Sequence, residues 1–478
     1  MPERTISYFL ETEVPTNYIG NLLDFIYQKY LLPQQKRFTN IYRTTINGQS
    51  SLAFAVLDPL GKQNLKVEIH GSKPIKVTII PTDETVTEQT IADAKQDVVI
   101  AVDYFEEKIR QNTLYFAWRE GEEIVPEKVS GKEKKPINRL FLETQVFLFV
   151  IFASLGLILF LIVGWYAPIV LMALQFIFVF YSSKIIERTA DWHITRNNPT
   201  IHLLEYHLPL EEQDSFEQKY PKEKLMEIKK EVYEQTISKK GEIDCETTQQ
   251  IFAKHGFECT PERLSAKKVN VYELVEKTAQ KFGFPMPEVI VSNTMIPNAA
   301  ASGPSPSRGV VLITTGLLVQ LDENEILSVL GHEFGHLKGR DPLLLYGLMG
   351  GEFLFRFYVL LPLFPIIFSS YIFLAYFWIV TGIIYFIAKF FEARADLTSA
   401  TVIGQPQVLA ESLEKIGFKR LLYERMPAYR VQEWISFDPH PPIYFRVSRL
   451  RKLDPAIKIK HPLVQSAREV TRGLLDSL

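Results

Sequence analysis

Residues 325–341 read EILSVLGHEFGHLKGRD, and the pattern H-E-x-x-H inside this stretch decides how the rest of the chain is interpreted. Apolar residues recur at helical spacing before the pattern, so we expect a helix with one face toward the core. Four residues along a helix is a rotation of about 400°, which puts His332 and His336 on one side, where both rings can bind one zinc ion. Glu333 lies about 100° round from His332 and can take the proton of a zinc-activated water.

A third zinc ligand is predicted in the sequence EARAD, which begins at Glu392. Catalytic zinc takes three protein ligands and keeps one position open. An apolar hairpin separates Glu392 from His336, and a hairpin returns the chain to the side it left. Asp396 shares the helix face of Glu392 and is expected to accept a hydrogen bond from a ligand histidine. The small Ala393 and Ala395 would allow close helix packing. The set predicts one Zn²⁺ per chain, although a charged helix end after an apolar segment is the simpler alternative.

Two long apolar segments predict membrane helices. The forty residues between Glu143 and Lys184 carry no charge, which is about twice what one bilayer crossing needs. Gly and Pro near the middle suit a turn, so we expect helices at roughly 142–163 and 167–184. A second hairpin is expected at roughly 342–361 and 366–388. A helical hairpin buried in a soluble core is the alternative.

Only Glu352 and Arg356 are charged within residues 342–388. They are four residues apart, so they either form an internal ion pair or line a polar cavity below the metal.

Charge around the hairpins predicts their orientation. Lys and Arg lie on both flanks of each hairpin and are missing from the two turns. The positive-inside rule therefore predicts a multi-pass protein of the cell membrane with both termini and the active site in the cytoplasm. The first residues, MPERTISYFLETEVP, do not have the pattern of a cleaved signal peptide.

The overall composition excludes several classes. The chain has 478 residues with 53 basic and 55 acidic side chains, a net charge of −2, so no nucleic-acid partner is expected. Two cysteines exclude a disulfide scaffold and a four-cysteine zinc cluster. The sequence does not indicate an oligomeric state.

Residues 1–137 are predicted to form a separate soluble α+β domain without a catalytic constellation. Residues 129–136 (VSGKEKKP) form a basic linker, suited to an anionic lipid surface or simply solvated, and the charged stretch 209–240 predicts a surface helix or one flanking the membrane. Within the domain we expect helices at 17–32 and 87–110, a turn at Asn47-Gly48, and strands at 38–46, 50–57, 65–71, 75–81 and, as the last strand, 113–120.

Taken together, these motifs resemble the HtpX-like membrane zinc metallopeptidases, a family that also contains the CAAX prenyl proteases. The resemblance is strongest over roughly 270–400. It is carried by His332 to His336 with Asp341, by Glu392 with Asp396, by the NAAASG stretch from Asn298, and by the HPP sequence from His440 with Arg446.

The resemblance implies a multi-pass α-helical membrane protein. Its zincin-type (HExxH) metallopeptidase domain would be mostly α with a small β-sheet, beside the N-terminal soluble α+β domain. The expected boundaries are 1–137 for the N-terminal domain, 138–185 for transmembrane hairpin 1, 186–341 for the cytoplasmic part of the peptidase with the HExxH helix, 342–390 for transmembrane hairpin 2, and 391–478 for the part with the third zinc ligand and C-terminal helices.

The resemblance also implies roles for further residues. Asn298, Ala299, Ala300, Ala301 and Ser302 would form an edge strand to which an extended substrate peptide adds as another strand. His440 would stabilise the oxyanion or occupy the open zinc position in a resting form, whereas a histidine before two prolines is otherwise typical of a helix start. Asp341 and Arg446 would support the site.

The sequence thus predicts a zinc endopeptidase with Glu333 as general base. Its expected partners are the lipid bilayer and protein or peptide substrates, namely membrane or misfolded proteins at the cytoplasmic face. One alternative is a CAAX-type protease of prenylated C-termini, a group with more than four membrane segments. Another is a catalytically silent membrane scaffold, against which the intact Glu333 argues.

Overall fold

The structure is a computed structural model that describes residues 5–12, 14–46, 49–58, 61–83, 86–111, 113–122, 124–126, 145–188, 190–208, 219–258, 260, 263–368, 371–424, 427–454 and 459–478. The basic linker 129–136, the Asn47-Gly48 turn and residues 209–218 of the charged stretch lie outside the described residues. The chain divides into two compact units. The first comprises Met1–Leu114, Glu205–Pro221 and Glu258–Ser265; the second comprises Tyr115–Leu204, Lys222–Phe257 and Ala266–Leu478.

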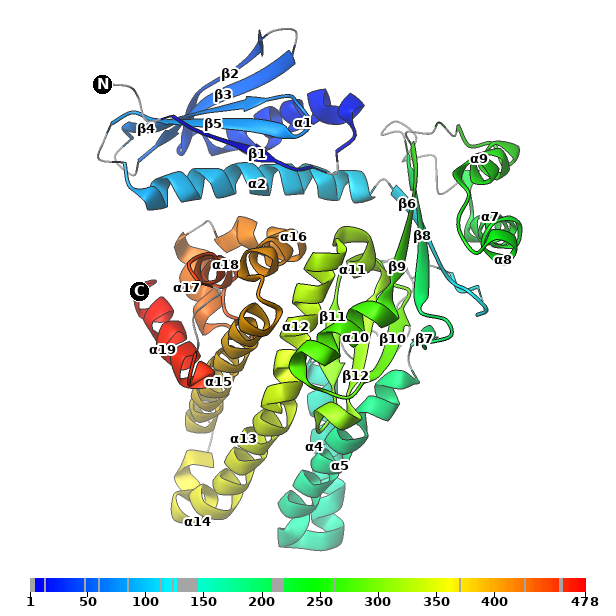
Figure 1. The fold of residues 1–478 in the computed structure, drawn as a ribbon. Coiled ribbons are helices and arrows are strands. Elements are labelled where there is room, and N and C mark those ends of the chain that lie inside the picture. Colours follow the sequence, from blue (N-terminus) through cyan, green and yellow to red (C-terminus); the bar gives the residue numbers. More distant parts are fainter. Residues whose placement is uncertain are drawn as a thin grey trace. The chain divides into compact units, whose positions relative to one another are not determined.

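The first unit contains a five-stranded antiparallel sheet in the order β1-β5-β4-β3-β2 (Figure 1). Alternate residues of β4, namely Leu65, Val67 and Ile69, are fully buried, because successive side chains of a strand point to opposite faces. The N-terminal strand β1 has no counterpart among the predicted strands. The elements are β1 (Ile6–Leu10), α1 (Ile19–Phe25), β2 (Phe38–Ile46), β3 (Gln49–Leu57), β4 (Gln63–His70), β5 (Ile75–Pro81) and α2 (Glu88–Gln111).

The strand predicted at 113–120 does not join this sheet. β6 (Thr113–Arg119) lies instead in a three-stranded sheet of order β6-β8-β9, with β8 (Thr200–His207) and β9 (Leu264–Asn270). The predicted strand is therefore confirmed, but it pairs outside the N-terminal sheet. Alternation of apolar and polar residues shows that a segment is a strand, but it does not identify the strand with which it pairs. Three helices lie between β8 and β9 in the sequence: α7 (Lys222–Gln235), α8 (Ile237–Lys240) and α9 (Cys245–Lys254).

A four-stranded sheet of order β11-β12-β10-β7 forms the core of the second unit (Figure 1). β10 and β12 are parallel, and β11 pairs antiparallel with β12 and lies at the edge. Side chains of β10 and β12 pack in one apolar cluster with those of helices α10 and α12. The elements are β7 (Trp192–Ile194), α10 (Val271–Phe282), β10 (Glu288–Ser292), β11 (Ala299–Ser302), β12 (Val310–Thr314) and α11 (Thr315–Gln320).

Helix α12 (Glu323–Gly339) carries the H-E-x-x-H motif and has well-defined ends. Asp322 and Glu325 form a reciprocal capping box at its start, which satisfies two backbone N–H groups. Arg340 ends it in the left-handed conformation, at φ 54°, so α13 (Asp341–Phe355) starts at once in a new direction. The remaining helices are α15 (Tyr371–Ile403), α16 (Pro406–Glu424), α17 (Pro427–Ile435), α18 (Ile443–Arg451) and α19 (Pro462–Leu475).

α12 packs closely along α15 (Figure 1). A Cβ atom added to Gly335 would lie 3.0 Å from the Ala395 Cα and 3.1 Å from its carbonyl oxygen. Ala393 and Ala395 are fully buried. Gly335 and Ala395 therefore bring the two backbones together, as expected for Ala395, whereas Ala393 packs with Trp434 and Val470.

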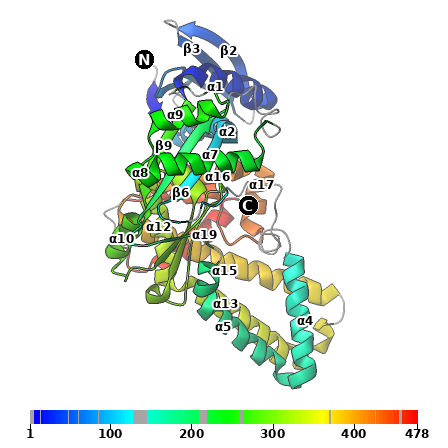
Figure 2. The same ribbon diagram turned by 90° about the vertical axis from the view of Figure 1, so that its right-hand side faces the viewer.

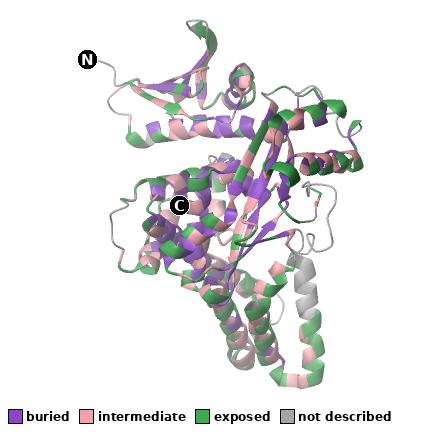
Figure 3. Cartoon of the chain, turned by 45° about the vertical axis from the view of Figure 1, so that its right-hand side comes forward, coloured by how far each residue is buried: buried purple, intermediate pink, exposed green. Residues whose placement is uncertain are grey.

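The apolar segments form helices. α4 (Gln145–Val163) and α5 (Ala167–Glu187) are joined by a short 3₁₀ turn, and α13 continues through a π-helical turn at Arg356–Leu360 into α14 (Leu361–Leu363). α13 packs against both α5 and α15 (Figure 2). Among the described residues, three segments are long and apolar enough to cross a membrane: Ser154–Ile177, Asp341–Leu363 and Tyr371–Ile403. Few of their residues are buried (Figure 3).

α15 differs from the helix predicted at 366–388. It begins at Tyr371 and continues without a break to Ile403, so that it carries Glu392 and Asp396 on the same helix as the apolar segment. The sequence after residue 388 becomes polar, but polarity changes the surroundings of a helix and does not end it.

Candidate metal centre

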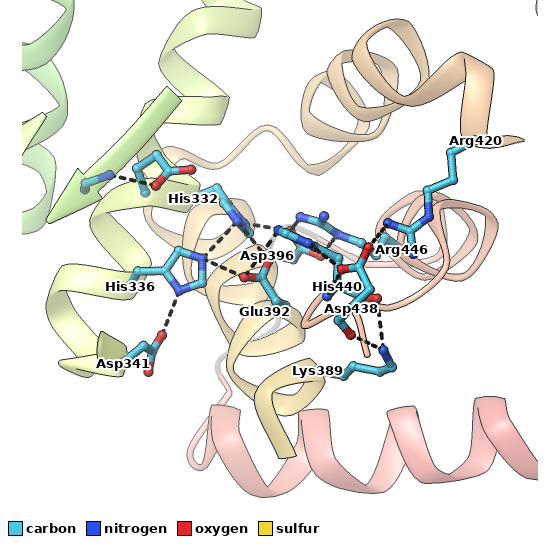
Figure 4. Close-up of polar contacts among 12 residues, drawn as sticks. His332, His336, Asp341, Lys389, Glu392, Asp396, Arg420, Asp438, His440 and Arg446 are labelled. Carbon is cyan, nitrogen blue, oxygen red and sulfur yellow. Dashed lines mark hydrogen bonds and ion pairs between the residues drawn. The ribbon is translucent and has the colours of Figure 1, made fainter. Parts of the chain in front are cut away.

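Three side chains from two helices converge at one point (Figure 4). The Nε2 atoms of His332 and His336, on α12, lie 3.1 Å apart. Glu392, on α15, places Oε2 3.4 Å from His332 Nε2 and Oε1 3.4 Å from His336 Nε2. One ligand atom from each of the three residues lies within 4.8 Å of the others. Two imidazoles and a carboxylate are the donor set of many catalytic zinc sites.

The outer nitrogen of each histidine ring faces an aspartate (Figure 4). His332 Nδ1 lies 2.8 Å from Asp396 Oδ1, and His336 Nδ1 lies 2.8 Å from Asp341 Oδ2. A carboxylate at Nδ1 favours the ring form with its proton on that nitrogen, which leaves the Nε2 lone pair directed at the centre. The left-handed turn at Arg340 is what brings Asp341 back to His336.

Each of these aspartates is in turn paired with an arginine. Arg446, on α18, holds Asp396 with two hydrogen bonds, Nε to Oδ2 at 2.8 Å and Nη2 to Oδ1 at 2.7 Å. Arg394, on α15, donates to Asp341. The bidentate pair fixes the orientation of the Asp396 carboxylate, and all four groups are largely buried.

The charges around the centre fit a bound cation. Glu392 is only 11% exposed, and among the described residues its buried Oε2 receives no hydrogen bond. Burial lowers the pKa of His332, but the facing carboxylates of Asp396 and Glu392 outweigh burial and raise it to about 10. Burial also lowers the pKa of His336, but the charge of Glu392 acts in the opposite direction, and the net effect is a raised pKa. The carboxylates therefore stabilise positive charge at this point, which a divalent metal supplies.

Glu333 connects the centre to the edge strand. The backbone N–H of Ala301, on β11, donates to Glu333 Oε2 at 3.0 Å. This N–H therefore points away from β12, toward the outer edge of the sheet. Ser302 contacts Ser182 of α5, with their hydroxyl oxygens 3.0 Å apart, and Asn298 is joined to Thr314 just before the strand begins. The structure thus brings β11 beside Glu333.

His440 lies on the other side of Glu392. Its Nε2 is 3.6 Å from Glu392 Oε1, and its side chain is 45% exposed, far more than those of the three clustered residues. It precedes α18, whose first amides, those of Ile443 and Tyr444, each donate to Glu424 at 2.8 Å. His440 is therefore both near a helix start and near the centre, so the two expectations for it are compatible.

The polar residues of the second hairpin form a pair. Arg356 Nε lies 3.3 Å from Glu352 Oε1, and Tyr376 of α15 donates to the same oxygen at 2.8 Å. Tyr376 was not predicted from the sequence as a site residue, nor were Arg394, Asp438 and Lys389 near the metal centre. Arg394 lies inside the EARAD sequence and Asp438 is two residues before His440, so adjacency to site residues was the available signal.

Comparison with known proteins places this geometry in context. Residues 265–454 match the pattern of peptidase family M48. A "Protease HtpX homolog" of Desulforapulum autotrophicum is 31% identical over 224 residues, covering 41% of this chain and 71% of that protein. The Pyrococcus furiosus protein of the same description is 32% identical over 213 residues, covering 38% and 73%. The crystal structure of S. mikatae Ste24p aligns with 76% of this chain and 85% of its own, at 14% identity and a TM-score of 0.32.

Proposed function

Because the chain belongs to peptidase family M48, together with the HtpX proteases, and is a membrane metalloprotease, we propose that it is a zinc endopeptidase that cleaves membrane or misfolded proteins at the cytoplasmic face. His332, His336 and Glu392 would hold the metal. Zinc bound there would supply Lewis acidity, which polarises the scissile carbonyl and makes water at its open position a better nucleophile.

The observation that carries this proposal is the position of Glu333. Its carboxylate lies between the two clustered histidines in sequence and against the edge strand in space. A carboxylate in this place can take a proton from the attacking water and pass it to the leaving amine.

The edge strand supports binding of an extended peptide. β11 has a neighbour on one side only within its sheet, so its outer edge can pair with a substrate strand, and the Ala301 amide would exchange its hydrogen bond to Glu333 for one to the substrate. Residues Asn298 to Ser302 have small or short side chains, so pairing through the backbone would impose little selection on the substrate sequence. His440, whose Nε2 lies 3.6 Å from Glu392 Oε1, would stabilise the oxyanion.

The test is digestion of unfolded casein by protein purified in mild detergent. We expect Glu333→Gln to lower the rate by about 10²- to 10⁴-fold, because the general base is lost, while one zinc per chain stays bound. A chelator should abolish the wild-type rate. Glu323→Gln is the matched control, because Glu323 is exposed in the first turn of the same helix.

Two outcomes would contradict the proposal. A Glu333→Gln protein that digests casein as fast as wild type would exclude Glu333 as the base. A wild type that binds zinc but digests neither casein nor a membrane protein would favour a narrow substrate such as a prenylated C-terminus, or a scaffold.

A further inference from the structure

Three histidines surround Glu392, and the structure supports all three in the same way (Figure 4). His332 and His336 each face an aspartate at Nδ1, and an arginine pairs with that aspartate. His440 shows the same order. Its Nδ1 lies 2.8 Å from Asp438 Oδ1, and Asp438 Oδ2 lies 3.0 Å from Arg420 Nη1.

Asp438 holds both the backbone and the ring of His440. Its Oδ1 accepts the His440 backbone N–H at 2.8 Å as well as the contact from the ring. Two contacts from one carboxylate oxygen fix the rotation of the ring about its bond to the backbone. With Nδ1 held in this way, Nε2 is the nitrogen that faces Glu392.

Lys389 ties this loop to the helix that carries Glu392. It lies three residues before Glu392 on α15 and is fully buried. Its Nζ donates to the carbonyl oxygen of Asp438, and it also approaches the carbonyl oxygens of Ser436 at 3.5 Å and His440 at 3.4 Å. Burying an ammonium group is costly unless it is hydrogen-bonded, so these carbonyl groups and Lys389 stabilise one another. The loop that ends at His440 is thereby set at a fixed distance from Glu392.

We propose that Asp438 is a positioning residue that holds His440 with Nε2 directed at the reaction centre, and that Lys389 anchors the loop which carries both. This inference rests on the proposed function, because it gives His440 a task in the reaction. Asp438 thus differs in role from Asp341 and Asp396, which support the proposed zinc ligands His336 and His332. His440 lies outside the cluster of His332, His336 and Glu392, so loss of Asp438 should reduce turnover without releasing the metal.

A double-mutant cycle tests the proposal, with kcat and KM measured on casein. We expect His440→Ala to lower kcat about 10²-fold, as loss of one oxyanion donor does. Asp438→Ala should lower kcat by about 10- to 100-fold with KM and zinc content unchanged. The double variant should be no slower than His440→Ala, because a residue that acts only through His440 has no effect once His440 is gone.

Two further variants complete the design. Asp438→Asn keeps one carbonyl oxygen that can accept from His440, so it should recover part of the lost rate. Ser436→Ala is the matched control in the same loop, because its side chain bonds only to the Glu433 carbonyl among the hydrogen bonds described. It should behave as wild type.

The outcomes distinguish the inference from the proposed function. The positioning role would be overturned if the kcat losses of the two single variants multiplied in the double variant, or if Asp438→Ala lost zinc. Neither result would contradict the proposed protease function. An inactive wild type would contradict the proposed function instead. In that case, affinity of the zinc-loaded protein for a peptide hydroxamate replaces turnover, and equal affinities of wild type and Asp438→Ala would overturn the inference.

Discussion

Asp396 and Asp341 do not contact the centre of the donor cluster, yet they decide how its two histidine rings are turned. A ring free to rotate would offer its nitrogen lone pair to the metal only part of the time. Asp396 has a second task, because it neutralises the buried guanidinium of Arg446. A buried charge left without its partner is strongly destabilising.

We therefore expect Asp396→Asn and Asp341→Asn each to weaken zinc affinity by about 10- to 100-fold. Each change leaves an arginine with a neutral partner, but Asp396→Asn should lower the thermal midpoint more than Asp341→Asn, since Asp396 and Arg446 are more deeply buried than Asp341 and Arg394 and are joined by two hydrogen bonds. Competition with a chromophoric chelator measures the affinity, and Asp476→Asn at the exposed end of α19 is the control. Unchanged zinc affinity in both variants would show that the aspartates do not support the ligands.

Glu424 gives the protein a pH dependence away from the metal. Burial raises the pKa of Glu424 to about 7, although hydrogen bonds from the Tyr444 and Ile443 amides act in the opposite direction. A carboxyl group that holds its proton more tightly when folded adds stability below its unfolded pKa of about 4.5, and this stability is lost as the pH rises to about 7.

Relative to Glu424→Gln, the wild type should thus lose about 1–3 kcal/mol of unfolding free energy between pH 4.5 and pH 7. Denaturant unfolding of both proteins across this range measures the difference. A difference that stays constant with pH would mean that Glu424 titrates normally in the folded protein.

Among the elements, α12 and α15 are the pair whose separation sets the donor cluster, since one carries both histidines and the other carries Glu392. Gly335 lies between the two histidines and permits the close approach. A Cβ there would meet backbone atoms of Ala395, which cannot move aside as a flexible side chain can.

Gly335→Ala should accordingly destabilise the protein by about 1–3 kcal/mol and weaken zinc binding, because it forces the helices apart. Thermal unfolding and the chelator assay measure both effects. Gly347→Ala on α13 is the control, because a Cβ there meets no atom within 4 Å. If both glycine variants behave alike, the helix contact does not set the geometry of the cluster.

The helices and strands of the fold differ in how far the sequence could predict them. Helical spacing identified the α12 motif, and alternation identified strands such as β2 and β5, because both signals are local. The partner of β6 and the contacts of Lys389 with the loop before His440 could not be predicted, because they depend on which distant segments meet. Asp438 lies two residues before His440, so its position in the sequence could have identified it. The apolar helix at 366–388 and the helix face shared by Glu392 and Asp396 were predicted separately, and the sequence did not show that one helix, α15, carries both.

At the scale of the whole molecule, the proposed topology has both hairpin turns outside the cytoplasm. Tyr166 lies in the first turn and is 68% exposed, and Phe364 lies in the second and is 53% exposed. Cys245 is an exposed residue of α9 and should lie on the cytoplasmic side.

A membrane-impermeant maleimide applied to intact cells should thus label Tyr166→Cys and Phe364→Cys in a background with both native cysteines replaced by serine. With Cys259 alone replaced, Cys245 should react only after the membrane is permeabilised. Labelling of Cys245 in intact cells would reverse the proposed orientation.

The unbroken course of α15 has a consequence for where cleavage can occur. Between Tyr371 and Glu392 the helix rises about 32 Å, close to the roughly 30 Å thickness of a bilayer's hydrocarbon core. If α15 spans the bilayer as proposed, one continuous helix sets the distance between the lipid and the scissile bond. A thicker bilayer would draw the metal centre toward the headgroups, and a thinner one would lift it clear. Lipid composition would then select which peptide bonds the enzyme reaches, by their height above the membrane surface and independently of their sequence.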